Sequence, residues 1–88
     1  MNWRIIVHHE VEKQLSAIPQ DRRRRILADL RELAGDPFRG LVKPLKGKAH
    51  KGHYRKVSGR YRIIFKPSHA TRTVEVLAVL LRNEHTYQ

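Results

Sequence analysis

The sequence contains no cysteine, so it can form neither a disulfide framework nor a thiolate metal site. This absence suits a reducing compartment, and we expect the protein to be cytoplasmic. No stretch approaches the ~20 apolar residues that a membrane-spanning helix needs, which argues against a membrane partner. The opening residues, Asn2-Trp3-Arg4, begin no long apolar run, so we expect no signal peptide.

Acidic residues are scarce, because eight Asp and Glu stand against 19 Lys and Arg, for a formal net charge of +11. In a chain of 88 residues this charge creates a strong positive field, whose commonest partner is nucleic acid. An acidic protein segment and an anionic membrane surface are weaker alternatives. The length predicts one domain, residues 1–88, and the 40% apolar content is enough for one modest core.

The first half of the chain predicts one strand and two helices. Residues 3–7 alternate between apolar and polar side chains, as a strand does. Residues 9–18 and 20–34 each carry apolar side chains at helical spacing, and Gly35 ends the second helix. We therefore expect a helical hairpin with one apolar stripe on each helix, packed on a sheet. Arg22 to Arg25 form either a phosphate- or partner-contacting ridge or a solvated helix face.

Residues 52–66 predict two antiparallel strands joined by a turn at Ser58-Gly59. This register sets Arg55 directly opposite Arg62. Because side chains alternate between faces, one face is apolar and aromatic, with Lys56 at its end near the turn, and carries Tyr54, Tyr61, Ile63 and Phe65. The other face is mostly basic and carries His53, Arg55, Val57, Arg60, Arg62, Ile64 and Lys66.

The paired arginines indicate an anion-binding site. Like charges opposite each other destabilise a sheet, and a phosphate bridging two guanidinium groups would relieve the repulsion. Solvated surface arginines are the alternative, but the clustering of basic residues favours the site. Residues 37–51 have no clear period and predict a short strand or irregular loop whose lysines border the arginine face.

The C-terminal part predicts a loop at residues 67–70 and a strand at residues 73–81. The strand is almost continuously apolar, which is typical of an interior strand covered on both faces. A polar cluster, residues 82–88, follows it. We expect no metal site, because neither His8-His9 nor the pair His50 and His53 has the further ligands that zinc requires.

The order of a strand, two helices and three strands resembles the RelE/ParE toxin superfamily of bacterial toxin–antitoxin modules. The likeness covers nearly the whole chain. The segments that carry it are Leu45-Lys46-Gly47, Gly52-His53-Tyr54-Arg55, Gly59-Arg60-Tyr61-Arg62-Ile63-Ile64-Phe65 and Val76-Leu77-Ala78-Val79, followed by Arg82 and Tyr87.

This resemblance implies a small α+β fold: an N-terminal strand, a helical hairpin and three antiparallel strands in one twisted sheet with the helices on one face. It implies a toxin, monomeric when alone, whose partners are an antitoxin with an acidic segment, mRNA and the ribosome. In the RelE-like branch it implies metal-independent endoribonuclease activity without a cofactor, in which the ribose 2′-hydroxyl attacks the adjacent phosphate.

The resemblance also implies site residues. Arg62 and Arg55 would stabilise the transition state, Arg82 would hold a phosphate, and Tyr87 would act in proton transfer or stack on a base. Further contacts to RNA or its phosphates would come from Lys46, Lys48, Lys51, His53 and Arg60. His85, His53 and Glu84 are further candidates for the acid or the base, since histidine titrates near neutrality.

One departure from the family pattern concerns the strand that carries Arg55. Many RelE-like members have a second basic residue where this sequence has Val57, and the adjacent Lys56 should face the core.

Two other functions remain open: a ParE-like inhibitor of DNA gyrase, and a non-catalytic basic module that binds nucleic acid. Neither requires an acid–base set.

Overall fold

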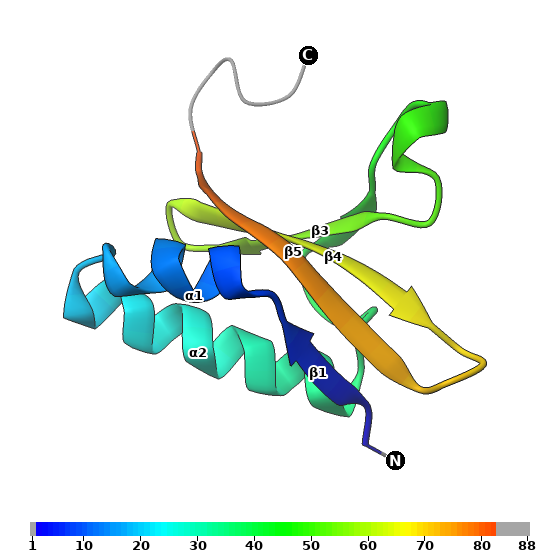
Figure 1. Cartoon of the computed structure of the whole chain (residues 1–88), viewed down its shortest axis with the longest axis horizontal. Coiled ribbons are helices and arrows are strands. Elements are labelled where there is room, and N and C mark those ends of the chain that lie inside the picture. The colour runs from blue at the N-terminus through cyan, green and yellow to red at the C-terminus, as the bar shows by residue number, and fades with distance from the viewer. Residues whose placement is uncertain (1, 83–88) are drawn as a thin grey trace.

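The computed structural model describes residues 2–82, which form two layers, a pair of helices against one face of a sheet (Figure 1). In chain order the elements are β1 (Arg4–Val7), α1 (His9–Ser16), α2 (Gln20–Gly35), β2 (Val42–Pro44), the short 3₁₀ helix η1 (Lys48–His50), β3 (Tyr54–Ser58), β4 (Tyr61–Ser68) and β5 (Thr73–Leu81). Neither helix of this part of the chain combines the length and the apolar character needed to cross a membrane.

Within residues 2–82 the sheet has five strands in the order β1-β5-β4-β3-β2. The N-terminal strand pairs in parallel with β5, and every other pair is antiparallel. The predicted α+β class, with both helices on one face, is confirmed. The strand count differs, because the irregular segment before the hairpin contributes β2 as a short edge strand.

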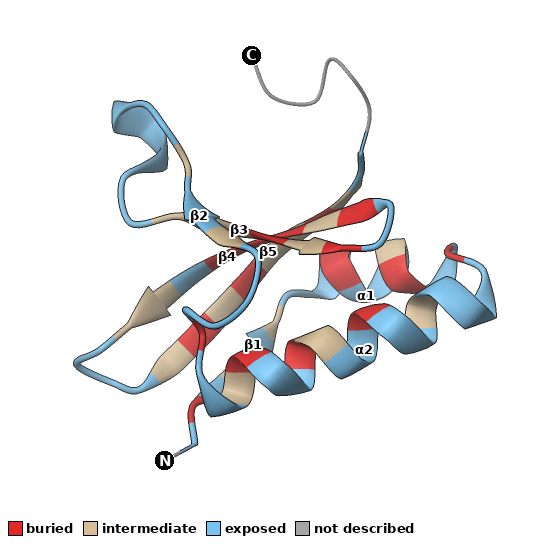
Figure 2. Cartoon of the chain, turned by 180° about the vertical axis from the view of Figure 1, so that it is seen from behind, coloured by how far each residue is buried: buried red, intermediate tan, exposed pale blue. Residues whose placement is uncertain are grey.

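The core lies between the helices and one face of the sheet, where buried positions line the inward sides of both layers (Figure 2). The helical contribution is the apolar stripe expected from the sequence: Val11 and Leu15 of α1, and Ile26, Leu30 and Leu33 of α2. The sheet contributes Tyr61, Ile63 and Phe65 of β4 and Val74, Val76 and Val79 of β5, in which the pairing with β4 shifts by one residue between Val76 and Ala78. Burying these side chains supplies the main driving force for folding.

Within residues 2–82, neither α1 nor α2 covers the opposite face of the sheet, and this corrects the prediction for β5. The strand is interior in the pairing order, between β1 and β4, but helices cover only one of its faces. Its apolar run is continuous because the residues on the second face, among them Leu77 and Leu80, are half-buried by neighbouring side chains instead of by a second layer.

The turn of the β3–β4 hairpin is Gly59-Arg60, and the predicted turn at Ser58-Gly59 is wrong. Gly59 has a φ of 59° and occupies the first turn position, where type II′ hairpins place glycine. The pairing therefore shifts by two residues, which leaves every side chain on its predicted face. Arg62 now lies opposite Val57, so it is a diagonal neighbour of Arg55, at roughly 7–8 Å, and not its direct partner.

Two element ends also differ from the sequence prediction. The first helix ends at Ser16, short of the predicted position 18. Strand β4 continues through Pro67 to Ser68, so only the second half of the predicted loop is a turn. Pro67 pairs with Val74 of β5. Proline is tolerated here because β3 pairs with β4 only as far as Phe65, so Pro67 has a neighbouring strand on one side alone.

Candidate functional site

The uncovered face of the sheet, which we call the open face, carries the basic residues of the hairpin. Arg55 and Val57 project from β3, and Arg62 and Ile64 project from β4, because each lies one residue away from a core position. The alternation that buries Tyr61, Ile63 and Phe65 thus places the two arginines on the side away from the helices.

A pocket of about 330 Å³ lies on the open face, between the loop before β2 and the end of β5. Its basic side chains come from four parts of the sheet: Lys43 of β2, Arg55 of β3, Arg62 of β4 and Arg82 directly after β5. The remaining lining residues are Gly40, Leu41, Val42 and Val57. No acidic residue of the described chain lines it, so the pocket is a concentrated cationic site.

Lys43 lies directly opposite Arg55 in the β2–β3 ladder. A direct like-charge pair was expected on this face, but its second member is Lys43 and not Arg62. The lysines of residues 37–51, Lys43 among them, were expected to border the arginine face, and Lys43 does so. Its pairing with Arg55 was not predicted, because β2 is only three residues long and is followed by a loop without period. The available signal was its position one residue from Val42, which is half-buried and packs against the core.

The structure brings together three of the five predicted catalytic residues, Arg55, Arg62 and Arg82. Arg60 lies beside them at the turn, where its carbonyl accepts a hydrogen bond from the Arg82 amide at 2.6 Å. His85 and Tyr87, like the spare candidate Glu84, lie outside the described residues, and their roles stay predictions.

The other predicted phosphate contacts lie apart from the pocket. Lys46, Lys48, Lys51 and His53 belong to the connection between β2 and β3, which includes η1 and projects from the sheet on the side away from the helices (Figure 1). The three lysines are exposed and His53 is half-buried, and none of the four lines the pocket. They could contact a ligand that extends beyond it.

Comparison with known proteins gives matches at the level of structure. No family model matches the sequence, and no curated protein matches it. The archaeal RelE–RelB complex of Pyrococcus horikoshii has a chain that superposes with a TM-score of 0.80 and 27% identity, over 96% of this chain and 99% of that one. The RelB–RelE complex of Methanococcus jannaschii gives 0.67 and 25%, over 88% and 89%.

The toxin–antitoxin complex RelBE2 of Mycobacterium tuberculosis has the same fold, with a TM-score of 0.79 at 20% identity over 93% of this chain and 100% of that one. The agreement with the Pyrococcus and Mycobacterium structures covers more than nine tenths of each chain. The chain has the fold of the RelE/ParE toxin superfamily and is similar to its solved members.

The pocket is suited to binding phosphate groups and to stabilising their negative charge. Arginine offers a planar fork of donors that fits phosphate oxygens, and several cations together stabilise charge that develops on an oxygen. Arginine has no acceptor atom and stays protonated, so it cannot remove a proton. None of the described residues that line the pocket is a histidine or a carboxylic acid, and among these lining residues only Lys43 has a side chain that commonly serves in proton transfer.

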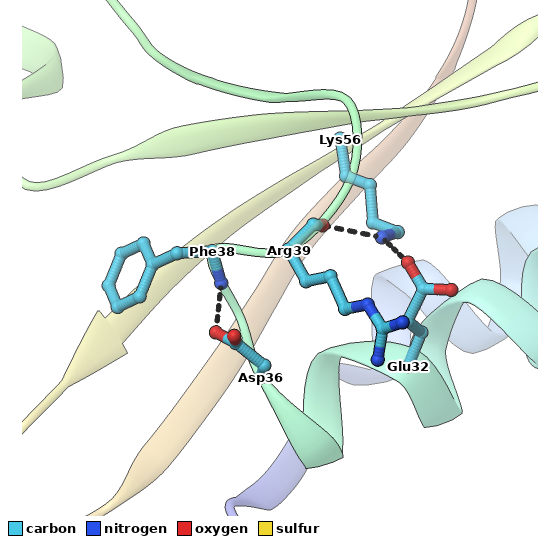
Figure 3. Close-up of polar contacts among 5 residues, drawn as sticks. All are labelled: Glu32, Asp36, Phe38, Arg39 and Lys56. Carbon is cyan, nitrogen blue, oxygen red and sulfur yellow. Dashed lines mark hydrogen bonds and ion pairs between the residues drawn. The ribbon is translucent and has the colours of Figure 1, made fainter.

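One more charged residue lies behind the pocket, on the core face of β3. Lys56 is 2% exposed, and its Nζ donates hydrogen bonds to Glu32 Oε1 at 2.5 Å and to the Arg39 carbonyl at 3.1 Å (Figure 3). The hydrogen bond and the charge of Lys56 lower the pKa of Glu32 below its usual value, and the charge of Arg39 adds to this effect. The core-facing position of Lys56 was predicted, but its partners were not.

Proposed function

We propose that this protein is the toxin of a type II toxin–antitoxin module and that it inhibits translation by cleaving mRNA on the ribosome. The observation that carries the proposal is the pocket itself, in which Lys43, Arg55, Arg62 and Arg82 gather on the open face and the described lining residues include no acid. The solved structures that share the fold, described as RelE–RelB complexes, support the toxin assignment.

In the proposed reaction the ribose 2′-oxygen attacks the adjacent phosphorus and the bond from phosphorus to the 5′-oxygen breaks. The products are a 2′,3′-cyclic phosphate and a free 5′-hydroxyl. The 2′-hydroxyl gives its proton to a base, and the leaving 5′-oxygen takes one from an acid. Arg62 and Arg55 would stabilise the extra negative charge on the phosphate oxygens, and Arg82 would hold a neighbouring phosphate.

The proton donor and acceptor of this reaction remain to be assigned. His85 and Tyr87 are our candidates, because Arg82 lines the pocket and both follow it closely in the sequence. Histidine titrates near neutrality and can serve as either acid or base. Variants at these two positions should therefore change the pH profile of cleavage as well as its rate.

The same pocket should also be the site at which an antitoxin inhibits the toxin. A basic surface attracts an acidic protein segment as readily as RNA, so we propose that an antitoxin covers the pocket with acidic side chains. Related structures are complexes of RelE with RelB, which makes a partner of this kind the first to seek. A toxin–antitoxin complex that leaves Arg55 and Arg62 accessible would contradict this part of the proposal.

Primer extension on mRNA in a cell-free translation reaction tests the proposed activity. We expect discrete cuts that appear only when ribosomes and the protein are both present. If translation continues and no cuts appear, the ribonuclease assignment is wrong, and a DNA gyrase supercoiling assay becomes the next experiment. Blocked translation without cuts would indicate binding to RNA without catalysis.

A further inference from the structure

The buried cation Lys56 serves no purpose in the proposed chemistry, because it points away from the pocket. It lies on the core face of β3, between Arg55 and Val57, whose side chains both line the pocket on the other face. Placing an ammonium group in a protein interior is costly, and a well-packed apolar side chain is often as good or better for stability. Lys56 therefore calls for a role other than holding the fold together.

Lys56 and its neighbour Val57 attach one segment to the strand from two sides. The Lys56 ammonium holds the Arg39 carbonyl at 3.1 Å, and the Val57 amide donates to the Leu41 carbonyl at 3.1 Å. The residue between these two attachments, Gly40, and Leu41 itself form one wall of the pocket. The position of that wall is thus set by the main chain of residues 39–41, and Lys56 fixes its first attachment.

Glu32 fixes the direction in which Lys56 points. The carboxylate projects from α2, and in Figure 3 the Lys56 ammonium lies between it and the Arg39 carbonyl. Gly40 packs closely over the same pair: a side chain at this position would lie 3.1 Å from Glu32 Oε1 and 3.2 Å from Lys56 Nζ. The wall is therefore in contact with the ion pair as well as bonded to it.

We propose that Lys56, held by Glu32, is a positioning residue that sets the wall of the cationic pocket through the Arg39 carbonyl. The wall leads directly into β2, whose Lys43 faces Arg55 across the ladder. Displacing the wall would move Lys43 and change the spacing of the cations that bind phosphate. The consequence for cleavage rests on the proposed function, whereas the consequence for wall position and for RNA binding does not.

The test compares the wild type with Lys56→Met, Lys56→Arg and Glu32→Ala. Methionine has a similar length and suits a buried site but cannot donate, whereas arginine restores both charge and donors. Three readouts are needed: amide hydrogen exchange at Val57, affinity for a short 2′-O-methyl RNA that cannot undergo 2′-hydroxyl attack, and ribosome-dependent cleavage. Unfolding in urea is measured alongside to separate wall displacement from loss of the fold.

For Lys56→Met we expect cooperative unfolding close to that of the wild type and exchange of the Val57 amide at least tenfold faster. Affinity for the RNA should fall several-fold, and cleavage should fall roughly ten- to a hundredfold, the scale on which small misplacements act. Lys56→Arg should recover much of each loss. Glu32→Ala should change all three readouts in the same direction by less, because Lys56 keeps its bond to Arg39.

Wild-type exchange at Val57 and wild-type RNA affinity in a folded Lys56→Met variant would overturn the proposal. If Lys56→Met does not fold, a further variant, Glu32→Gln, decides, because its amide oxygen can still accept from the buried Lys56 ammonium while the charge that holds the ammonium is lost. Unchanged exchange and affinity in that variant would equally reject a positioning role. If the wild type itself cuts no mRNA, the proposed function is wrong, but the exchange and affinity measurements still test whether Lys56 positions the pocket wall.

Discussion

Lys43 and Arg55 face each other across the β2–β3 ladder, and both side chains line the same pocket. Like charges in this arrangement destabilise a sheet. We therefore predict that Lys43→Glu raises the free energy of unfolding by roughly 0.2–1 kcal/mol, the range measured for cross-strand pairs. The same change should weaken binding of 2′-O-methyl RNA, because it places a negative charge in the pocket.

Urea unfolding and fluorescence anisotropy measure the two effects of Lys43→Glu. The control is Arg31→Glu, which makes the same change of charge on an exposed position of α2, in the helical layer. It should leave RNA affinity much closer to that of the wild type. Equal losses of affinity in the two variants would mean that net charge, and not the pocket, governs binding.

The salt dependence of RNA binding should report the number of phosphates held in the pocket. For single strands the slope of log affinity against log salt is about 0.7 per neutralised phosphate. We predict that Arg62→Ala lowers the slope by about 0.7. Val57→Ala, which removes an uncharged lining side chain, should keep the slope of the wild type. An unchanged slope in Arg62→Ala would show that this guanidinium holds no phosphate.

Stability should depend on pH through Glu32, whose pKa Lys56 lowers from its usual 4.5. A carboxyl group with a lowered pKa stabilises the folded state above its unfolded pKa, and this contribution disappears as the pH falls through the folded pKa. The difference in unfolding free energy between the wild type and Glu32→Gln should therefore be largest above about pH 4.5 and shrink below it. Urea titrations across this range measure it, and a constant difference would contradict the ion pair.

Alanine substitutions at three glycines separate two costs at Gly40: the strain of a positive φ and the close approach of a side chain to Glu32 and Lys56. Gly40 and Gly52 have φ values of 85° and 81°, so alanine at either should cost about 1–2 kcal/mol of stability. Of these two, only Gly40 would bring an added Cβ within 4 Å of neighbours, Glu32 and Lys56, so Gly40→Ala should cost roughly 1 kcal/mol more, about the value of a hydrogen bond. Gly35→Ala, with neither strain nor neighbours, should be close to neutral. Equal losses at Gly40 and Gly52 in urea unfolding would contradict the contact.

The sequence predicted the two faces of the hairpin even though it misplaced the turn. A strand alternates with period two, so the shift from Ser58-Gly59 to Gly59-Arg60 moved the pairing by two residues and kept Arg55 and Arg62 on the open face. Local pattern thus decides which face a side chain occupies. It does not decide which residue lies opposite, because that depends on the turn geometry.

The features that sequence reasoning missed depend on contacts between distant segments. Lys56 and Glu32 are 24 residues apart, and no local spacing links a strand lysine to a helix carboxylate. The parallel pairing of β1 with β5 likewise joins the two ends of the described chain. The apolar run of β5 predicted a covering layer on both faces of the strand. An apolar residue that is half-buried by neighbouring side chains gives the same sequence pattern as one covered by a helix, so the sequence could not separate the two cases.

Primer extension with the wild type, Arg62→Ala and Arg31→Ala tests whether the pocket is the place where mRNA is cut. Both arginines carry the same charge, but only Arg62 lines the pocket. We predict discrete cuts by the wild type and Arg31→Ala, and a loss of roughly 10²–10³-fold in cleavage rate for Arg62→Ala, the scale of removing one group that stabilises developing charge. Cleavage by Arg62→Ala at the wild-type rate would contradict the assignment of the pocket as the catalytic site.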